Sequence, residues 1–254
     1  MSARTHRRVA HVMGMPVSLA LRGEHAEGPR ADAAWNAALA VLDDVDAVFS
    51  THRPGSVVSR LDRGEVLPAD CPPEVAEVLE IGAQAERDSA GAFAVRRRGP
   101  DGTEVLDPSG VVKGWAAERA AVPLRALPGT EFCLSLGGDL VCRTLDAGTP
   151  PWRIGIEDPA DPRRLVAVVP VPTGAVATSG TAHRGQHLVD ARTGVPPEGV
   201  ASVTVVAASL TDADVDATVA YALGADAARW LAARPGRTGL VVWADGTTTV
   251  VGAD

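Results

Sequence analysis

The sequence predicts a mixed α/β (α+β) protein that folds as one compact domain with two lobes. In several segments apolar residues recur at helical spacing, whereas other segments are short runs of β-branched and apolar residues. The two kinds of segment follow one another without strict alternation, and glycine and proline are spread through the connections. Because no internal repeat or low-complexity linker divides the chain, a single body is favoured.

The clearest helix is predicted over residues 31–49, where Trp35, Leu42 and Phe49 fall on one face and acidic residues on the other. A second helix is predicted to begin at Pro73, since proline fits a first helical turn, where its missing N–H costs little. Further helices are expected over 114–121 and from positions near Asp212 and Asp226.

Strands are predicted where β-branched and apolar residues form short runs bounded by turn residues. These runs are residues 132–136, 165–171, 202–208 and 240–243. Asp245-Gly246 follows the last run and precedes a further run at 247–251, which is typical of a β-hairpin.

Composition limits the classes of function. The chain has 254 residues, of which 46% are apolar, enough for a substantial core. The net charge of −8 and the pI of about 5.3 argue against a nucleic-acid surface, which needs clustered Lys and Arg. The basic run Arg96–Arg98 is interpreted as an exposed loop.

The N-terminal residues 1–23 contain no apolar run long enough for a signal-peptide core or a membrane span. We therefore expect a cytoplasmic protein that does not insert into a membrane. Cys71, Cys133 and Cys142 show no C-x-x-C spacing, so neither a disulfide framework nor a zinc site is predicted. Reduced, mostly buried thiols are expected.

An acidic cluster stands at the start of the helix predicted near residue 212. Asp212 suits an N-cap position, because its carboxylate can accept N–H groups of the first turn. Asp214 and Thr218 are four residues apart and share a helix face, where a carboxylate and a hydroxyl suit Mg²⁺ or Ca²⁺. An EF-hand is excluded, since Ala217 and Leu223 replace its glycine and final glutamate. A capped acidic helix start remains the alternative.

Two glycine-containing segments suggest contact with a ligand. In "VLDPSGVVKGW", Asp107 and Gly110 precede Lys113 at a predicted helix start, where a lysine suits phosphate. The spacing is not that of a P-loop, and a plain strand-to-helix turn is the alternative. Gly137, Gly138 and Asp139 separate two apolar runs, which indicates either a bulge approached by another group or a hairpin turn.

Residues 175–194 gather many polar side chains within a short span. Two histidines, with hydroxyls, arginines and a carboxylate, suit proton transfer or anion binding. A Ser-His-Asp hydrolase is disfavoured, because no G-x-S-x-G motif surrounds Ser179. The residues are Thr178, Ser179, His183, Arg184, His187, Asp190 and Arg192.

The order of these motifs resembles that of the ApbE family of flavin transferases over nearly the whole chain. The segments that carry the resemblance are "MGMPVSL" (13–19), "FSTHRPGSVVSRL" (49–61), "DPSGVVKGW" (107–115), "LGGD" (136–139), "WRIGIEDP" (152–159), "ATSG" (177–180), "HLVDARTG" (187–194) and "TDADVDAT" (211–218). The resemblance implies a T-fold-like domain over residues 10–254, with FAD in a cleft between two lobes. Residues 1–9 are expected to be a disordered tail.

The resemblance also implies a reaction. Members of the family split FAD with the help of Mg²⁺, release AMP and join FMN through a phosphoester to a threonine or serine of an acceptor protein. Some relatives hydrolyse FAD to FMN and AMP instead, and others mainly hold it. An FAD pyrophosphatase and a non-catalytic FAD-binding protein are therefore the alternatives. The acceptor and the oligomeric state cannot be inferred from the sequence.

Site residues follow from the matching motifs. Asp214 and Thr218, with a backbone carbonyl near Gly110, match the Mg²⁺ ligands, whereas Asp216 is given no metal role. His187 is the expected general base, Asp190 its alternative or orienting partner, and Lys113 an additional positive charge. Contacts with FAD are expected from Met13, Gly14, His52, Asp107, Gly110, Lys113, Gly137, Gly138, Asp139, Thr178, Ser179, Gly180 and His187. Among these, Gly137, Gly138 and Asp139 are expected near the adenosine part, and Ser179 and Gly180 near the phosphates.

The chain departs from the family pattern at several positions. His52 stands where a flavin-stacking tyrosine is common, and Asp62 where an asparagine is common. The segment "TAHRG" links "ATSG" directly to the histidine motif, in place of a longer insert. Ala191 replaces the proline of the commoner "DPRTG", with a mild loss of rigidity.

Overall fold

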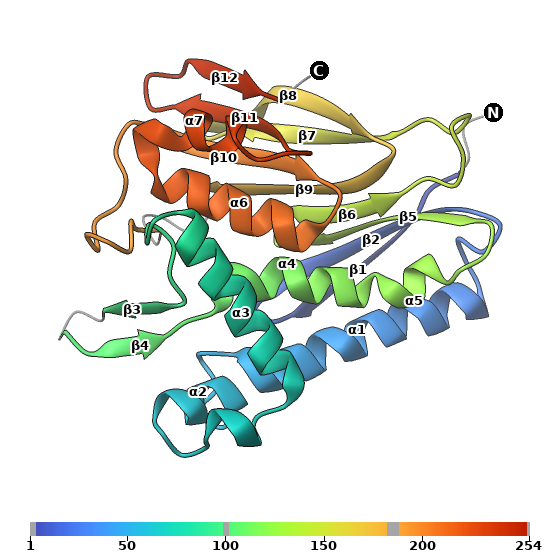
Figure 1. Ribbon diagram of the computed structural model, residues 1–254. Helices are drawn as coiled ribbons and strands as arrows, with labels where there is room; N and C mark the ends of the chain where they lie inside the picture. Colours follow the sequence, from blue (N-terminus) through green and yellow to red (C-terminus); the bar gives the residue numbers. More distant parts are fainter. Residues whose placement is uncertain (1–3, 99–101, 182–187, 253–254) are drawn as a thin grey trace.

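The computed structural model describes residues 4–98, 102–181 and 188–252. Within these ranges, eight strands form one fully antiparallel sheet that has helices over one face and a β-hairpin over the other (Figure 1). In sheet order the strands are β1 (His6–Val12), β2 (Met15–Gly23), β5 (Thr130–Leu136), β6 (Asp139–Arg143), β9 (Thr173–Gly180), β10 (Val200–Ala207), β11 (Thr238–Trp243) and β12 (Thr248–Val251).

Successive side chains of a strand point to opposite faces of the sheet, and here both faces carry apolar side chains. Leu19 and Leu21 of β2 belong to the large core beneath the helices, whereas Ala20 between them belongs to a smaller core. That smaller core lies under the hairpin formed by β7 (Trp152–Asp158) and β8 (Asp161–Val171). The sheet is therefore the middle of three layers.

The helices cover the face of the large core (Figure 1). They are α1 (Pro29–Phe49), α2 (Val57–Asp62), α3 (Pro73–Asp88), α4 (Ser109–Ala120), α5 (Val122–Arg125), α6 (Leu210–Ala222) and α7 (Ala227–Ala232), with the 3-10 turns η1 (Pro68–Asp70) and η2 (Gly224–Asp226). A two-stranded ribbon of β3 (Arg96–Arg98) and β4 (Glu104–Leu106) precedes α4.

Most elements agree with the sequence predictions. Helices are found where the sequence predicted them, over residues 31–49, from Pro73, and from positions near residues 212 and 226. The helix predicted over 114–121 begins earlier, at Ser109. There the carboxylate of Asp107 accepts hydrogen bonds from the N–H and hydroxyl of Ser109, which supports the first turn. The predicted hairpin after residue 240 is formed by β11 and β12.

Three expectations are wrong. Residues 6–9, expected in a disordered tail, belong to β1, because their backbone pairs with β2. Arg96–Arg98, expected in an exposed loop, form β3 and pair with β4. The N-cap of α6 is Ser209 rather than Asp212, since the helix begins at Leu210 and Asp212 lies in its first turn.

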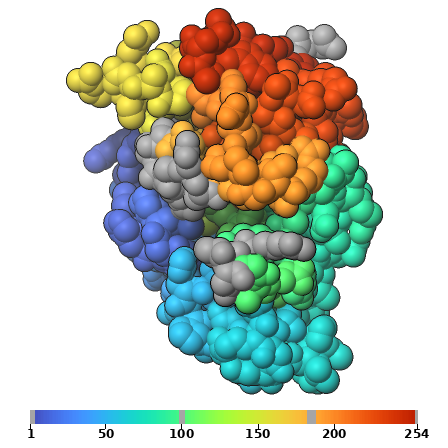
Figure 2. All heavy atoms as spheres, turned by 90° about the vertical axis from the view of Figure 1, so that its left-hand side faces the viewer, coloured from blue at the N-terminus to red at the C-terminus, as the bar shows by residue number. Residues whose placement is uncertain are grey.

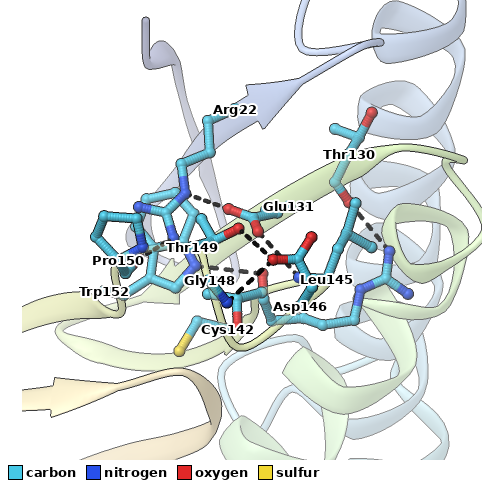
Figure 3. Close-up of polar contacts among 12 residues, drawn as sticks. Arg22, Thr130, Glu131, Cys142, Leu145, Asp146, Gly148, Thr149, Pro150 and Trp152 are labelled. Atoms are coloured by element: carbon cyan, nitrogen blue, oxygen red, sulfur yellow. Dashed lines mark hydrogen bonds and ion pairs between the residues drawn. The ribbon is translucent and has the colours of Figure 1, made fainter. Parts of the chain in front are cut away.

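A buried ion pair anchors the segment that leads into β7 (Figure 3). Glu131 on β5 is almost fully buried and pairs with the guanidinium of Arg22 on β2. Its other carboxylate oxygen accepts the N–H of Leu145, 2.9 Å away, while Arg22 donates to the carbonyl of Pro150. The Arg22 guanidinium also lies 4.1 Å from the ring centre of Trp152, the first residue of β7. These contacts fix the start of the hairpin against the sheet.

The cysteines agree with the predicted reduced state. The structure describes all three cysteines, Cys71, Cys133 and Cys142, and each is free. Burial raises the pKa of the Cys133 and Cys142 thiols to about 12, so both stay protonated at neutral pH. Among the helices that the structure describes, none has the length and apolar character needed to cross a membrane.

Candidate functional site

A cleft of about 610 Å³ opens at one end of the sheet. The antiparallel order places two tight turns there, Met13-Gly14 between β1 and β2 and Gly137-Gly138 between β5 and β6. The end of β9 and the start of β10 lie at the same end. In Figure 2 the surface is hollowed between the orange segment of residues 188–199 and the green β3–β4 ribbon.

The cleft collects residues that lie far apart in the sequence. Twelve of the thirteen residues expected to contact FAD line it, and His187 lies outside the described residues. The twelve are Met13, Gly14, His52, Asp107, Gly110, Lys113, Gly137, Gly138, Asp139, Thr178, Ser179 and Gly180. Asp214 and Thr218 also line it, together with Ile156 and its neighbours on the β7–β8 hairpin. The cleft therefore lies between the helix layer and the hairpin layer.

The turn between β5 and β6 has the left-handed backbone that a tight hairpin turn requires. Gly137 and Gly138 have φ values of +57° and +102°, and Leu136 pairs directly with Asp139, so the hairpin-turn interpretation is correct. Met13 has a φ of +56°, a conformation that is uncommon for residues with a side chain. Such strain is typical of functional sites, and here it lies at the rim of the cleft.

Helices α4 and α6 meet at Gly114, which brings the acidic cluster to the cleft. A Cβ atom at Gly114 would lie 2.5 Å from the carbonyl oxygen of Leu210 and 2.8 Å from the Cβ of Asp214. The glycine N–H donates to Asp214 Oδ2 over 2.9 Å. The absence of a side chain thus allows α6 to pack directly against α4 and sets Asp214 beside Lys113.

Replacing Gly114 with alanine is expected to destabilise the protein by about 1–3 kcal/mol, because the added methyl group overlaps the backbone of α6. Helix propensity alone predicts the opposite sign, since alanine is favoured over glycine by about 1 kcal/mol in a helix. Urea denaturation measures the change in unfolding free energy. Gly55→Ala is the control, since a methyl group added there would have no atom within 4 Å. Equal stability of the two variants would contradict the close contact.

Asp214 is fully buried and surrounded by charged groups. Its Oδ1 lies 3.1 Å from the Lys113 ammonium. Burial raises the pKa of Asp214 to about 7, with Lys113 opposing and the nearby Asp139 carboxylate adding to the rise. Burial alone would lower the pKa of Lys113, but Asp214 and Asp139 outweigh it and raise that pKa above its ordinary value. Lys113 therefore carries a positive charge in the cleft wall.

Asp139 holds Lys113 from the other side. One of its carboxylate oxygens contacts the Lys113 ammonium, and the other accepts the N–H of Thr178 over 2.8 Å. Both oxygens are thus engaged within the protein. Asp139 lines the cleft as the sequence indicated, and its carboxylate contacts Lys113 and the end of β9.

The expected metal ligands lie together on the same side of the cleft. The hydroxyl of Thr218 is 3.1 Å from that of Ser179, and a Cβ at Gly110 would lie 3.9 Å from the Thr218 methyl group. Within the described ranges no group of three or more His, Cys, Asp and Glu side chains could hold a metal ion. A carboxylate, a hydroxyl and a backbone carbonyl nevertheless form the oxygen-only donor set that fits Mg²⁺, which takes its remaining ligands from water and phosphate.

The other two aspartates of the cluster face away from the cleft. Asp216 is 1% exposed and pairs with Arg237 over 2.6 Å and with Arg234 over 3.2 Å. Asp212, one turn earlier, lies 3.2 Å from Arg237. Residues four apart share a face of a helix. Asp212 and Asp216 therefore lie on one face of α6, whereas Asp214 and Thr218 lie on the opposite face, toward the cleft.

Sequence reasoning missed several residues that line the cleft. Arg97 lines it and pairs with Asp107 over 3.0 Å. Burial alone would raise the pKa of Asp107, but hydrogen bonds from Ser109 and the contact with Arg97 outweigh it and hold that pKa below its usual range. Ser202 also lines the cleft, from a run that was predicted only as a strand. It pairs with Gly180 on β9, a register that the sequence alone does not reveal.

Asp190 is not among the residues that line the cleft. It begins a turn in which its carboxylate binds the guanidinium of Arg192, with a shortest distance of 2.6 Å. This hydrogen-bonded contact lowers the pKa of Asp190 below its ordinary value. Asp190 as the alternative general base, or as the orienting partner of His187, stays a prediction, since His187 lies outside the described residues.

Comparison with known proteins identifies the family. A family model described as "ApbE family" matches residues 13–98 and 97–242. The "FAD:protein FMN transferase" of Salmonella typhimurium is 30% identical over 169 residues, which cover 63% of this chain and 48% of that protein. The protein of the same name from Escherichia coli is 32% identical over 141 residues, which cover 52% and 40%. The chain thus spans about half the length of the curated relatives it matches, or less.

The fold has close counterparts among solved structures. "Flavin Transferase ApbE from Vibrio cholerae" superposes with a TM-score of 0.82 at 20% sequence identity, covering 98% of this chain and 96% of that one. The ApbE protein from Thermotoga maritima gives a TM-score of 0.81 at 21% identity, covering 98% and 97%. The structures show the same fold, and the family match along most of its length shows that the chain belongs to the ApbE family.

Proposed function

We propose that this protein transfers FMN from FAD to a threonine or serine hydroxyl of an acceptor protein, in a Mg²⁺-dependent reaction that releases AMP. The observation that carries the proposal is the convergence of twelve expected FAD contacts and both expected metal-ligating side chains on one cleft. Its volume of about 610 Å³ is typical of a cofactor-sized site. Relatives named FAD:protein FMN transferase support the same activity.

In this reaction the oxygen of the acceptor hydroxyl forms a bond to the FMN phosphorus, and the bond from that phosphorus to AMP breaks. The hydroxyl proton passes to a base, for which we propose His187. Lys113 would hold a positive charge beside the diphosphate, oriented by Asp139. A Mg²⁺ ion held by Asp214, Thr218 and the Gly110 carbonyl would supply Lewis-acid neutralisation of the diphosphate charge.

The proposal is tested by incubating the purified protein with FAD, Mg²⁺ and a candidate acceptor flavoprotein. Chromatography measures AMP and free FMN, and intact mass spectrometry measures the acceptor. We expect an acceptor heavier by one FMN and an equal amount of AMP, with neither formed in EDTA. AMP with free FMN and an unmodified acceptor would show that the protein hydrolyses FAD and does not transfer FMN. Intact FAD with every acceptor tried would favour an FAD-binding protein.

Ser202 is expected to contribute to FAD binding. Its hydroxyl oxygen is buried at the cleft and has no hydrogen-bond partner among the described residues. An unpaired buried hydroxyl is unfavourable unless a ligand pairs with it. Ser202→Ala should weaken FAD binding by about five- to tenfold, the value of one hydrogen bond, without lowering the melting temperature. Fluorescence titration of FAD and thermal unfolding measure the two effects.

Thr204→Val is the matched control for Ser202→Ala. Thr204 lies two residues along the same strand, but its hydroxyl is bonded to that of Thr178 over 2.9 Å. This variant should lose stability and affect FAD binding less than Ser202→Ala. If Ser202→Ala lowers the melting temperature and leaves FAD affinity unchanged, Ser202 serves only packing.

A further inference from the structure

The Lys113 ammonium contacts Asp214, one of the groups expected to bind a divalent cation. It lies 3.1 Å from Asp214 Oδ1 and also contacts Asp139 Oδ2. Backbone N–H groups take the opposite oxygens, from Gly114 to Asp214 and from Thr178 to Asp139. Each of the four carboxylate oxygens therefore has a hydrogen bond or an ion pair inside the protein, and Asp139 Oδ2 has only the ion pair with Lys113.

Burial differs among the three charged side chains. The Asp139 and Asp214 side chains are each 3% exposed, whereas that of Lys113 is 21% exposed. The two carboxylates are fixed by short backbone hydrogen bonds, while lysine has a flexible four-carbon stem and three rotatable donors. Lys113 is thus the member of the cluster that can move toward the open cleft.

The charges also limit what the site can hold at once. With both carboxylates ionised, the two carboxylates and one ammonium give a net charge of −1, and the ammonium contacts both carboxylates. A divalent cation added beside Asp214 would face the ammonium at short range, and in a poorly solvated site this repulsion is strong. A diphosphate in the same cleft offers the ammonium another partner.

From these contacts we propose that Lys113 is an internal cation that competes with the divalent metal for Asp214, and leaves Asp214 only when a diphosphate enters the cleft. Metal and diphosphate therefore bind cooperatively, and the free protein binds metal weakly. This inference rests on the proposed function, which places both groups in the cleft. The new element is that Lys113 sets the order in which the metal and the diphosphate bind.

The test measures Mn²⁺ affinity by electron paramagnetic resonance, with no nucleotide present. Lys113→Met should bind Mn²⁺ at least tenfold more tightly than the wild type, because the competing ammonium is gone. Lys113→Met/Asp139→Asn keeps the net charge of the wild-type site at −1 and should also bind more tightly. This double variant separates the release of Asp214 from a change in charge, and it avoids two unpaired buried carboxylates should the single variant fail to fold.

Arg97→Met is the matched control. Arg97 is another cation of the cleft wall, but it pairs with Asp107 rather than Asp214. Its removal should change Mn²⁺ affinity by less than about twofold. Wild-type affinity for Mn²⁺ is then measured with ADP-ribose, which carries a diphosphate but no flavin, against a protein-free reference. We expect ADP-ribose to strengthen Mn²⁺ binding to the wild type by a larger factor than to the double variant, in which the diphosphate can still bind the metal but has no ammonium to draw away from Asp214.

The outcomes separate this inference from the proposed function. Equal or weaker Mn²⁺ binding by both Lys113 variants would overturn the competition, since Lys113 would then only support Asp214. If that result came with tight Mn²⁺ binding to the wild type plus ADP-ribose, the metal site itself would stand. If Mn²⁺ bound none of the proteins with or without ADP-ribose, both the inference and the proposed metal site would fail.

Discussion

Replacement of Asp214 by asparagine is expected to reduce FAD cleavage on the order of 10²–10³-fold, the effect of removing one group that stabilises developing charge. Asparagine retains an oxygen that can accept the Gly114 N–H, so the contact between α4 and α6 is preserved. The negative charge that the proposed Mg²⁺ site requires is lost. The release of AMP from FAD, followed by chromatography, measures the effect.

The same substitution should leave the stability of the fold nearly unchanged. Burial makes the ionised form of Asp214 unfavourable, as its raised pKa indicates, and a neutral amide removes this cost. Lys113 keeps its contact with Asp139. Full turnover by Asp214→Asn would show that the metal assignment is wrong, whereas lost turnover together with unfolding would leave Asp214 as a structural residue.

Asp216→Asn makes the same chemical change two residues later and is expected to have the opposite effect. Asp216 is buried between Arg234 and Arg237, and removing its charge leaves these two guanidinium groups with only the more exposed carboxylates of Asp88 and Asp212 as partners. Loss of one partner of a buried ion pair costs about 3–5 kcal/mol. Urea denaturation should show this loss, while turnover per folded molecule stays close to that of the wild type.

Asp212→Asn serves as the control for the second experiment. Its side chain is half exposed and only touches Arg237, so the unfolding free energy should change by less than about 1 kcal/mol. A stability loss as large as that of Asp216→Asn would show that burial does not separate the two residues. A loss of turnover in Asp216→Asn at full stability would place Asp216 in the site.

The acidic cluster shows what sequence could and could not reveal. Helical spacing predicted that Asp214 and Thr218 share a face, and both line the cleft. The partners of Asp216, Arg234 and Arg237, follow after another helix, so only tertiary structure brings them to α6. The N-cap was misplaced because Asp212 and Ser209 are both good capping residues, and propensity does not choose between them.

The fold was predicted best where local patterns decide it. Helix α1 follows from the helical spacing of its own apolar residues, and the β11–β12 hairpin follows from the Asp245-Gly246 turn. The strand at residues 6–9 depends on pairing with β2, and the ribbon strand β3 depends on pairing with β4. Such pairing depends on partners across the sheet and leaves a weak local signal.

The cleft was predicted through the order of motifs rather than through physical patterns. Glycine turns, Lys113 and Thr178 are each common features with ordinary structural explanations. The antiparallel order of the sheet brings the turns and Thr178 together, and the packing of α4 places Lys113 beside Asp139. Ser202 and Arg97 carried no motif signal and became evident only from their place in the cleft. The binding and catalytic roles of all these residues stay predictions.

A crystal structure of the protein with FAD and Mn²⁺ tests the central claim most directly, because anomalous scattering locates the cation. We predict one Mn²⁺ within about 2.5 Å of oxygen atoms of Asp214 and Thr218, with the FAD diphosphate as a further ligand. The Lys113 ammonium should then contact the diphosphate and no longer Asp214. A cation bound elsewhere, or FAD bound outside this cleft, would contradict the account.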